Sequence, residues 1–384
     1  MHRPTYTPDD MASRHWLLEH YRALGLDSHI DGVGNVFGFS PGSKPSLLIG
    51  SHAESQNQAG WLDGAMGVIY GLEVARALAE NADTAELPVS TVAWADEESH
   101  FIPLLGSRSY VEDLGDAELD AARNAYHGQP LRDALRDAGL EGVPRTFAEP
   151  SRHIGYLEAH IEQGDSLEAT GNRIGVVTSI VGIWQYTISF SGVQNHAGTT
   201  RMAIRRDAGL AAAKLACAID QAFPAVSGPR SVWTTGRITL DPGAPSIIPG
   251  RAEMLFQARD ENIDVLARMD ETLRRLVAEV AASTRCEASI DRTASGKPWR
   301  MSETFQDALE RAAERHAPGK HVRMPSGASH DAQLVARKMP AGMLFVPSIG
   351  GISHHWTENT SDDDLVLGCQ VLADAAEDIL RNAG

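Results

Sequence analysis

The chain has 384 residues, of which 42% are hydrophobic and 22% charged, a composition typical of a folded globular protein long enough for two domains. It carries 34 Lys and Arg against 51 Asp and Glu, and this formal net charge of −17 excludes a general attraction to nucleic acid or to anionic membranes. No run of about 18 apolar residues could span a bilayer, and the N-terminal segment lacks the apolar core of a signal peptide. We therefore expect a cytoplasmic protein without nucleic-acid or membrane partners.

The first quarter of the chain alternates helix and strand patterns. Apolar residues at helical spacing predict a helix over 9–24 and a second helix over 63–82, with Asp63 near its N-terminus. Short apolar runs predict strands over 30–39, 46–50 and 90–95. This alternation predicts an α/β sheet covered on both faces, in which ligands gather beyond the carboxyl ends of the strands.

The middle of the chain has a different pattern. It predicts two helices, over 203–222 and 263–282, and four strands, over 186–191, 232–240, 252–258 and 286–292. The last part returns to α/β character, with a helix over 303–316, a strand over 342–346 and a helix over 363–382. We therefore expect an α/β domain formed by residues 1–182 and 298–384, and an α+β domain over 183–297 inserted into it.

Residues that can bind metal ions fall at or near the predicted strand ends. They are His52, Glu54, Asp63, Glu97, Glu98, His160, Glu162 and His354. Histidine and carboxylate side chains together bind zinc, manganese and related ions, and a carboxylate can bridge two of them so that they activate a water. Singly, each residue has an ordinary alternative, such as a hydrogen-bonded histidine, a solvated acidic loop or, for His160, an exposed helix position. Their common placement favours a metal site.

The segments around these residues resemble a known family. They include GSHAESQNQAGWLDGAMG, WADEES, YLEAHIEQG, NHAGTTRMAIRRDA, HDAQLVA and FVPSIGGISHHWTE. They are similar to the metal-dependent amidohydrolases that comprise N-carbamoyl-L-amino acid hydrolase, β-ureidopropionase and allantoate amidohydrolase, within the aminoacylase and carboxypeptidase superfamily. The resemblance implies a metallopeptidase-like catalytic domain, with a mixed sheet flanked by helices, and an inserted α+β dimerisation or lid domain.

The resemblance also implies a site with two divalent metal ions. Its ligands would be His52 and Glu98 as terminal ligands, Asp63 as the bridge, and His160 and His354. Glu97 would be the general base. Zinc is the first choice of metal, and manganese, cobalt or nickel are compatible with the same ligands. In this family a non-proline cis peptide often follows the bridging aspartate, which implies one at Asp63–Gly64.

Further residues match positions that contact the substrate in the family. His196 would reach the active site of a partner subunit and polarise the scissile carbonyl, which implies a homodimer. Arg259 would bind a substrate carboxylate, for which a guanidinium fork is well suited, and His330 would contact the substrate. The ordinary alternatives are a capped helix N-terminus at Thr199 and Thr200, and an exposed arginine at a strand end.

The chain departs from the family pattern at several positions. Glu54 replaces an aspartate that orients the first histidine ligand. Ile183, followed by Trp184, replaces a glutamine, and Ser246 replaces an asparagine. We therefore expect a retained carboxylate anchor and a substrate less polar than allantoate, with Ile183 and Trp184 favouring an apolar or aromatic portion.

These inferences predict a hydrolase of linear amide C–N bonds, acting on an N-carbamoyl or related N-acyl derivative of a small carboxylic or amino acid. One alternative is an aminoacylase or dipeptidase with the same catalytic residues and a different pocket. Another is a catalytically silent relative that binds a small amide. The complete ligand set and Glu97 favour an enzyme.

Overall fold

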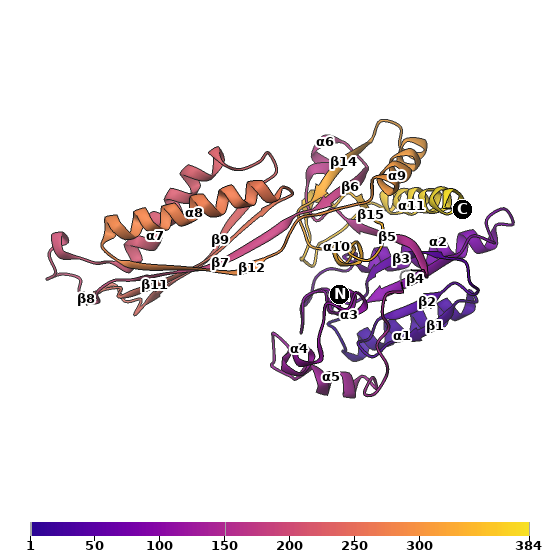
Figure 1. The fold of residues 1–384 in the computed structure, drawn as a ribbon, viewed down its shortest axis with the longest axis horizontal. Coiled ribbons are helices and arrows are strands. Elements are labelled where there is room, and N and C mark those ends of the chain that lie inside the picture. The colour runs from indigo at the N-terminus through magenta and orange to yellow at the C-terminus, as the bar shows by residue number, and fades with distance from the viewer. Residues whose placement is uncertain (1, 150, 384) are drawn as a thin grey trace. The chain divides into compact units, whose positions relative to one another are not determined.

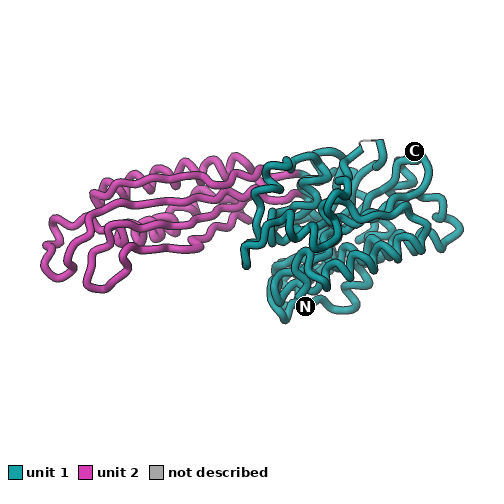
Figure 2. Tube along the Cα trace, turned by 90° about the horizontal axis from the view of Figure 1, so that it is seen from below, with its two compact units in different colours: residues 1–178, 300–384 teal, residues 179–299 magenta. Residues whose placement is uncertain are grey.

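The computed structural model describes residues 2–149 and 151–383, and the chain forms two compact units. Unit 1 comprises residues 1–178 and 300–384, and unit 2 comprises residues 179–299 (Figure 2). Unit 2 thus begins four residues earlier and ends two residues later than the insertion expected at 183–297. The roles expected for the two parts, catalysis and dimerisation, remain predictions.

Unit 1 is built around a mixed sheet, which confirms the predicted α/β class (Figure 1). Its nine strands follow the order β1-β2-β4-β3-β5-β15-β6-β13, and β14 also pairs with β6. The strands are β1 (Asp27–Ile30), β2 (Val36–Phe39), β3 (Ser46–His52), β4 (Val89–Trp94), β5 (His153–Ile161), β6 (Ile174–Ile180), β13 (Trp299–Arg300), β14 (His321–Ser326) and β15 (Ala341–Val346). β4, β3, β5 and β15 are mutually parallel neighbours, so their carboxyl ends lie at one edge.

Helices cover this sheet, so that its central strands are buried throughout. Every residue of β3, β4 and β15 is buried, as is typical of parallel strands that are covered on both faces. The longer helices are α1 (Pro8–Ala23), α2 (Ala65–Glu80), α9 (Glu303–His316) and α11 (Asp362–Asn382), and α2, α9 and α11 share one buried cluster with β3, β5 and β15. Shorter helices are α3 (Leu105–Tyr110), α4 (Asp116–Ala121), α5 (Leu131–Asp137), α6 (Ser166–Thr170) and α10 (Ala332–Val335).

One strand prediction and one alternative for unit 1 were wrong. The strand expected over 30–39 is interrupted, because Asp31 accepts hydrogen bonds from the backbone N–H groups of Val33 and Asn35 and closes a tight turn. Gly34 in this turn has a φ of 90°, which favours glycine. His160, for which an exposed helix was the alternative, instead lies near the end of the buried strand β5.

Unit 2 is an antiparallel sheet with two helices on one face (Figure 1). The strand order is β12-β7-β11-β9, formed by β12 (Glu287–Ser295), β7 (Gly182–Ser191), β11 (Arg251–Asp260) and β9 (Val232–Asp241). The helices are α7 (Ala208–Ala222) and α8 (Ile263–Thr284), and β8 (Asn195–His196) pairs with β10 (Ile247–Ile248) in a small second sheet. Along β7 and β11, buried residues alternate with more exposed ones, so one face packs against the helices and the other faces away from them.

Helix α7 begins five residues later than predicted. Asp207 precedes it and accepts a hydrogen bond from the backbone N–H of Leu210 at 3.0 Å, which caps the helix. Residues 202–204 form a separate 3-10 turn. Thr199 and Thr200 therefore do not cap this helix.

Within the part of the chain that the structure describes, no helix combines the length and the apolar character needed to cross a membrane.

Candidate active site

The predicted metal ligands lie together because of where their strands end. His52 is the last residue of β3, and His160 is the last but one of β5, its parallel neighbour. Glu97 and Glu98 follow β4, which pairs with β3 on the other side. Since these strands are parallel, the side chains at their carboxyl ends meet at one edge of the sheet.

Asp63 lies at the centre of this cluster. Its Oδ1 is 2.8 Å from His160 Nε2 and 3.4 Å from His52 Nε2. Its Oδ2 is 3.1 Å from Nε2 of His354, which comes from the loop after β15. Oδ1 thus faces the imidazoles of His160 and His52, and Oδ2 faces that of His354. A carboxylate that bridges two ions needs such an arrangement.

Three overlapping groups of residues could each hold a metal ion, because the ligand atoms within each group lie within 4.8 Å of one another. They are His52, Asp63 and His160; Asp63, Glu98 and His354; and His52, Glu97 and Glu98. The structure therefore brings all five predicted ligands together, and two of the groups share Asp63. Glu97 also approaches His52, with 3.7 Å between Oε2 and Nε2, so the two adjacent glutamates face the same cluster.

The acidic triplet at residues 96–98 is not the solvated loop that was its alternative. Asp96 is fully buried, and its carboxylate accepts hydrogen bonds from the backbone N–H groups of His100, Phe101 and Ile102. Glu98 is also buried, whereas 13% of the Glu97 side chain is exposed. Asp96 therefore orders the turn, and the side chains of Glu97 and Glu98 point to the cluster.

The charges of the cluster shift its titrations strongly. Burial raises the pKa of Glu97 well above its usual value, and the nearby carboxylates of Glu98 and Asp63 add to this rise. Burial also raises the pKa of Glu98, to about 7. The hydrogen bond with Asp63 raises the pKa of His354 to about 9. For His52, burial alone would lower the pKa, but the carboxylates of Glu97, Asp63 and Glu54 outweigh burial and raise it.

The donor set fits divalent metal ions. Imidazole nitrogens and carboxylate oxygens are the ligands of zinc and manganese sites. The Nδ1 of His160 lies 2.8 Å from the backbone oxygen of Ile161, and this contact turns Nε2 toward Asp63. Glu98 Oε1 is buried and has no hydrogen-bond partner among residues 2–149 and 151–383, although a polar atom buried in this way needs one. A cation at this position would satisfy it.

Two glutamine amides lie beside the acidic ligands. Gln163 Nε2 donates to Asp63 Oδ2 at 2.8 Å and lies 3.3 Å from His354 Nε2. Gln56 Nε2 donates to Glu98 Oε2. Both amides supply partial positive charge where the acidic ligands face the cluster.

The carboxylate of Glu54 does not orient the His52 imidazole, which is the role expected of the shorter aspartate in the family. Its carboxylate Oε1 is 3.7 Å from His52 Nδ1, while the backbone oxygen of Glu54 is closer, at 3.3 Å. Oε1 instead accepts hydrogen bonds from the backbone N–H groups of Glu97 at 2.6 Å and Glu98 at 3.4 Å. Oε2 pairs with the fully buried Arg14 of α1 at 3.0 Å. The longer side chain thus holds Glu97 and Glu98 through their backbone N–H groups.

The cis peptide bond expected at Asp63–Gly64 is absent. Among the described residues, the cis bond lies at Asp241–Pro242. Gly64 adopts a φ of 67°, and a Cβ at this position would lie 2.3 Å from the His52 ring. Close approach of the backbone to a ligand histidine explains the glycine here.

His330 lies beneath the cluster. It is buried, its Nε2 is 2.9 Å from Ser326 Oγ, and its ring packs edge-on against the His160 ring with 4.6 Å between centroids. Burial lowers the pKa of His330 well below its usual value. These contacts support an effect on the orientation of His160, and substrate contact by His330 remains a prediction.

The predicted substrate residues of unit 2 form two separate pairs. Ile183 and Arg259 are cross-strand partners of β7 and β11. His196 pairs with Ile247 in the small sheet, and the Ser246 oxygen accepts a hydrogen bond from the N–H of Ala197 at 2.9 Å. The second pair lies beyond the opposite end of β11 from Arg259, and eight strand residues span about 26 Å.

Trp184 does not line a substrate pocket as expected. It is buried in the core of unit 2, on the face of β7 that packs against the helices, and the Arg292 guanidinium lies over its ring at 4.3 Å. Neighbouring strand residues point to opposite faces. Since Ile183 lies on the other face, only Ile183 of the two is available to a ligand.

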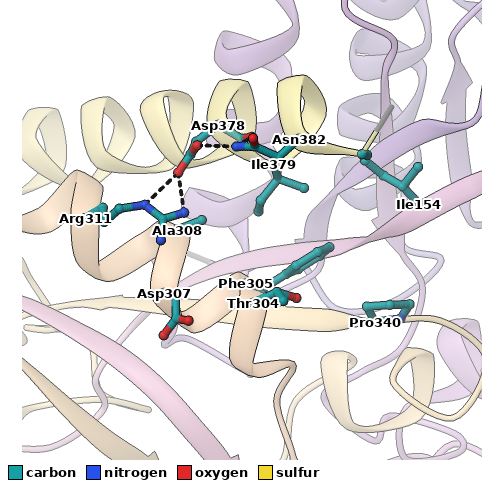
Figure 3. Close-up of a pocket in the computed structure, with 11 residues that line it drawn as sticks. Ile154, Thr304, Phe305, Asp307, Ala308, Arg311, Pro340, Asp378, Ile379 and Asn382 are labelled. Carbon is teal, nitrogen blue, oxygen red and sulfur yellow. Dashed lines mark hydrogen bonds and ion pairs between the residues drawn. The ribbon is translucent and has the colours of Figure 1, made fainter.

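A separate pocket of about 660 Å³ lies at the opposite end of the unit 1 strands (Figure 3). Phe305, Ala308 and Ile379 form its apolar part, and an ion pair joins Arg311 to Asp378 at 2.6 Å beside them. None of the predicted site residues belongs to its lining within the described part of the chain. It is distinct from the metal cluster.

Sequence reasoning missed several residues that support the cluster. They are Arg14, Gln56, Gln163 and Glu358. Glu358 follows His354 by four residues within the same family-like segment, so its spacing was a usable signal. Arg14 gave none, because its contact with Glu54 links residues 40 positions apart.

Comparisons with known proteins show which family this chain is similar to. Residues 25–378 match the family model of Peptidase family M20/M25/M40. An N-carbamoyl-L-amino-acid amidohydrolase of Paenarthrobacter aurescens is 33% identical over 96% of this chain and 91% of its own length. An allantoate amidohydrolase of Escherichia coli K12 is 32% identical over 97% and 91%. A crystal structure of a hydantoinase/carbamoylase family amidase from Burkholderia phymatum superposes with a TM-score of 0.92, at 47% identity over 99% of this chain and 93% of that one.

Proposed function

The chain belongs to peptidase family M20/M25/M40, a metal-dependent family, and is an amidohydrolase of linear C–N bonds, and we propose that its substrate is an N-carbamoyl or related N-acyl derivative of a small carboxylic or amino acid. The observation that carries this proposal is the cluster around Asp63. Three imidazoles contact the Asp63 carboxylate, and two acidic side chains lie beside it. The names of the relatives support the substrate class.

We propose that the cluster holds two divalent cations, zinc first among them. Asp63 would bridge the ions, His52 and His160 would complete one site, and Glu98 and His354 the other, as the two groups that share Asp63 suggest. Bound cations would supply positive charge that polarises the substrate carbonyl and makes a nearby water more acidic.

Glu97 is the proposed general base. Its side chain is more exposed than that of Glu98, 13% against 4%, so it is the more accessible of the two to a water molecule. It would accept the proton of the attacking water and then donate it to the departing nitrogen.

Arg259 is the proposed anchor for a substrate carboxylate. On β11, its cross-strand partners are Ile183 of β7 and Val232 of β9. The Val232 side chain is exposed. The Gln257 amide lies 3.0 Å from Arg259 Nε and accepts from it when its oxygen is turned to the guanidinium. A guanidinium between two aliphatic side chains suits a carboxylate that carries an apolar group, and hence a substrate less polar than allantoate.

We propose a homodimer in which His196 and Ser246 serve the site of the partner subunit. A small acyl amino acid is much shorter than the ~26 Å between these residues and Arg259, so all of them can contact one substrate only if two chains contribute. His196 Nδ1 accepts hydrogen bonds from the N–H groups of Gly198 and Thr199, which leaves an Nε2–H donor on an exposed ring for a substrate carbonyl.

The edge strand β9 supports this assembly. It is the outer strand of its sheet, it is largely exposed, and it carries the exposed apolar residues Val232, Ile238 and Leu240. Such an edge is a template for pairing with another chain.

The composition of the chain supports a cytoplasmic location.

The alternative is an aminoacylase-type hydrolase with the same catalytic residues and a different pocket. One screen separates the two. Purified protein loaded with Zn²⁺ or Mn²⁺ is incubated with matched N-carbamoyl, N-formyl and N-acyl amino acids, and the released amine is measured by liquid chromatography. We expect the N-carbamoyl series to be fastest; a faster N-acyl series favours the alternative, and no amine from any substrate contradicts the proposal.

A further inference from the structure

One buried carboxylate joins the two loops that carry ligands from opposite ends of the sequence. Glu358 is only 2% exposed. Its Oε1 accepts hydrogen bonds from the backbone N–H groups of Leu62 and Asp63, both at 3.1 Å. Its Oε2 accepts from Ser353 Oγ at 3.0 Å and from the backbone N–H of His354 at 3.2 Å.

These four hydrogen bonds use the whole acceptor capacity of the carboxylate. An ionised carboxylate has about four lone-pair sites, and hydrogen bonds to a charged acceptor are among the stronger ones in proteins. Two of the donors are the backbone N–H groups of Asp63 and His354 themselves. Trp61 adds another link between the two loops, because its Nε1 donates to the backbone oxygen of Glu358 at 2.5 Å.

The His354 imidazole contacts Asp63 and Gln163, but its position in the fold is exposed. His354 lies in a loop outside any strand or helix, its φ is 53°, and 51% of its side chain is exposed. Asp63, by contrast, is buried just before α2. A ligand on an exposed loop needs a support that fixes its distance from the ligand it shares an ion with.

We propose that Glu358 is a positioning residue that sets the distance between the Asp63 carboxylate and the His354 imidazole, and thereby the metal affinity of the group formed by Asp63, Glu98 and His354. The inference rests on the proposed function, because it needs metal to bind there. It does not need the substrate to be known.

The variant Glu358→Gln tests this role with almost no change in volume. An amide has one oxygen that accepts and one NH₂ group that cannot. Whichever way it turns, one of the two loops loses its acceptor, so the tie between them is broken while the apolar contacts remain. Glu358→Asp keeps the charge but is one methylene shorter, so a smaller effect is expected.

Asp31→Asn is the matched control. Asp31 is a fully buried carboxylate that accepts from the backbone N–H groups of Val33, Asn35 and Thr146 at 3.0, 2.9 and 3.1 Å. It joins two segments distant in sequence, as Glu358 does, but neither of them carries a predicted ligand. It therefore reports the cost of losing a buried carboxylate hub alone.

The experiment measures Zn²⁺ binding to the metal-free full-length proteins by calorimetry, together with the absorption spectrum of the Co²⁺-loaded forms and thermal unfolding. Glu358→Gln should weaken one class of metal site by roughly 10- to 100-fold and change the Co²⁺ bands. Asp31→Asn should lower the unfolding temperature but leave both metal readouts as in the wild type. In kinetics, Glu358→Gln should lower kcat more than it changes KM.

Wild-type Zn²⁺ affinity and Co²⁺ bands in Glu358→Gln, with a loss of thermal stability like that of Asp31→Asn, would overturn the inference. If Glu358→Gln does not fold, Glu358→Asp decides in the same assays, and unchanged metal readouts there count against the role. A wild-type protein that binds no divalent metal would instead contradict the proposed function, so the two failures are distinguishable.

Discussion

The ligand cluster of unit 1 and the outer sheet face of unit 2 are built in opposite ways. In unit 1, most of the polar side chains of the cluster are buried and held by several partners each, as at Asp96 and Glu54, and His354 is the half-exposed exception. In unit 2, His196 and Ser246 are exposed, and Ile183 and Arg259 lie half-buried on an open strand face. The groups proposed to hold metal ions are mostly fixed by several contacts each, whereas the groups proposed to recognise a substrate are presented on a surface.

The strongest test of the buried region is Glu97→Gln. The amide keeps the shape of the side chain but cannot accept the proton of water, so turnover should fall by roughly 10²–10⁴. Metal content, measured by mass spectrometry of the purified protein, should stay near that of the wild type. Unchanged turnover would mean that Glu97 is not the base, and a large loss of metal would make it a ligand.

The next effect concerns His196 on the exposed region. Loss of a donor to the substrate carbonyl should lower kcat by about 10²–10³ in His196→Ala. The control mixes this variant with Glu97→Gln subunits under conditions of exchange. If the site is shared, one of the two sites in each mixed dimer is wild type, and a one-to-one mixture should recover roughly a quarter of wild-type turnover. No recovery despite proven exchange, or a fully active monomer, would refute the shared site.

A smaller effect is expected for Arg259→Ala. Loss of one charged hydrogen-bonded pair costs about 1.5–3 kcal/mol, which corresponds to a fall in kcat/KM of roughly 10- to 150-fold on a carboxylate substrate. The neutral amide of the same substrate is the control, and its hydrolysis should change little. Equal losses on both substrates would make Arg259 a structural residue.

The smallest effect is a pH dependence of metal binding. In the metal-free protein the pKa of His354 is raised to about 9, and the imidazole must lose its proton to bind an ion. Below pH 9, binding therefore releases this proton, and this step alone should raise the apparent affinity by up to about tenfold per pH unit until about pH 9, in addition to the contribution of any other ligand that is still protonated. Titrations with Mn²⁺ from pH 6.5 to 9.5 check this. An affinity independent of pH across this range would exclude His354 from the ligands.

Much of the fold and the ligand set could be predicted from the sequence, because the signals are local. Helix α9 has the bounds predicted from its apolar spacing. His52 ends β3 and Glu98 comes shortly after the end of β4, so the α/β rule for ligand sites was sufficient to bring them together. The family resemblance added the roles of the residues.

The remainder depended on contacts between distant segments or on which face of a strand a residue occupies. Glu358 contacts Asp63 across 295 positions, and no local pattern encodes such a hydrogen bond. Trp184 was assigned to the same pocket as Ile183, but a shift of one residue along a strand reverses the face. The turn closed by Asp31 interrupts an apolar run that otherwise has the pattern of a single strand.

Helix α1 supplies none of the proposed ligands, but its Arg14 pairs with Glu54, which in turn holds the backbone of Glu97 and Glu98. Arg14 also donates to the backbone oxygens of Gly34 and Trp94, so one guanidinium fastens the N-terminal segment to the ends of β4 and β3. Proteolysis or a shortened expression clone that removes α1 would leave Glu54 as an uncompensated charge beneath the metal cluster, a situation that is strongly destabilising. We therefore expect activity to depend on an intact α1.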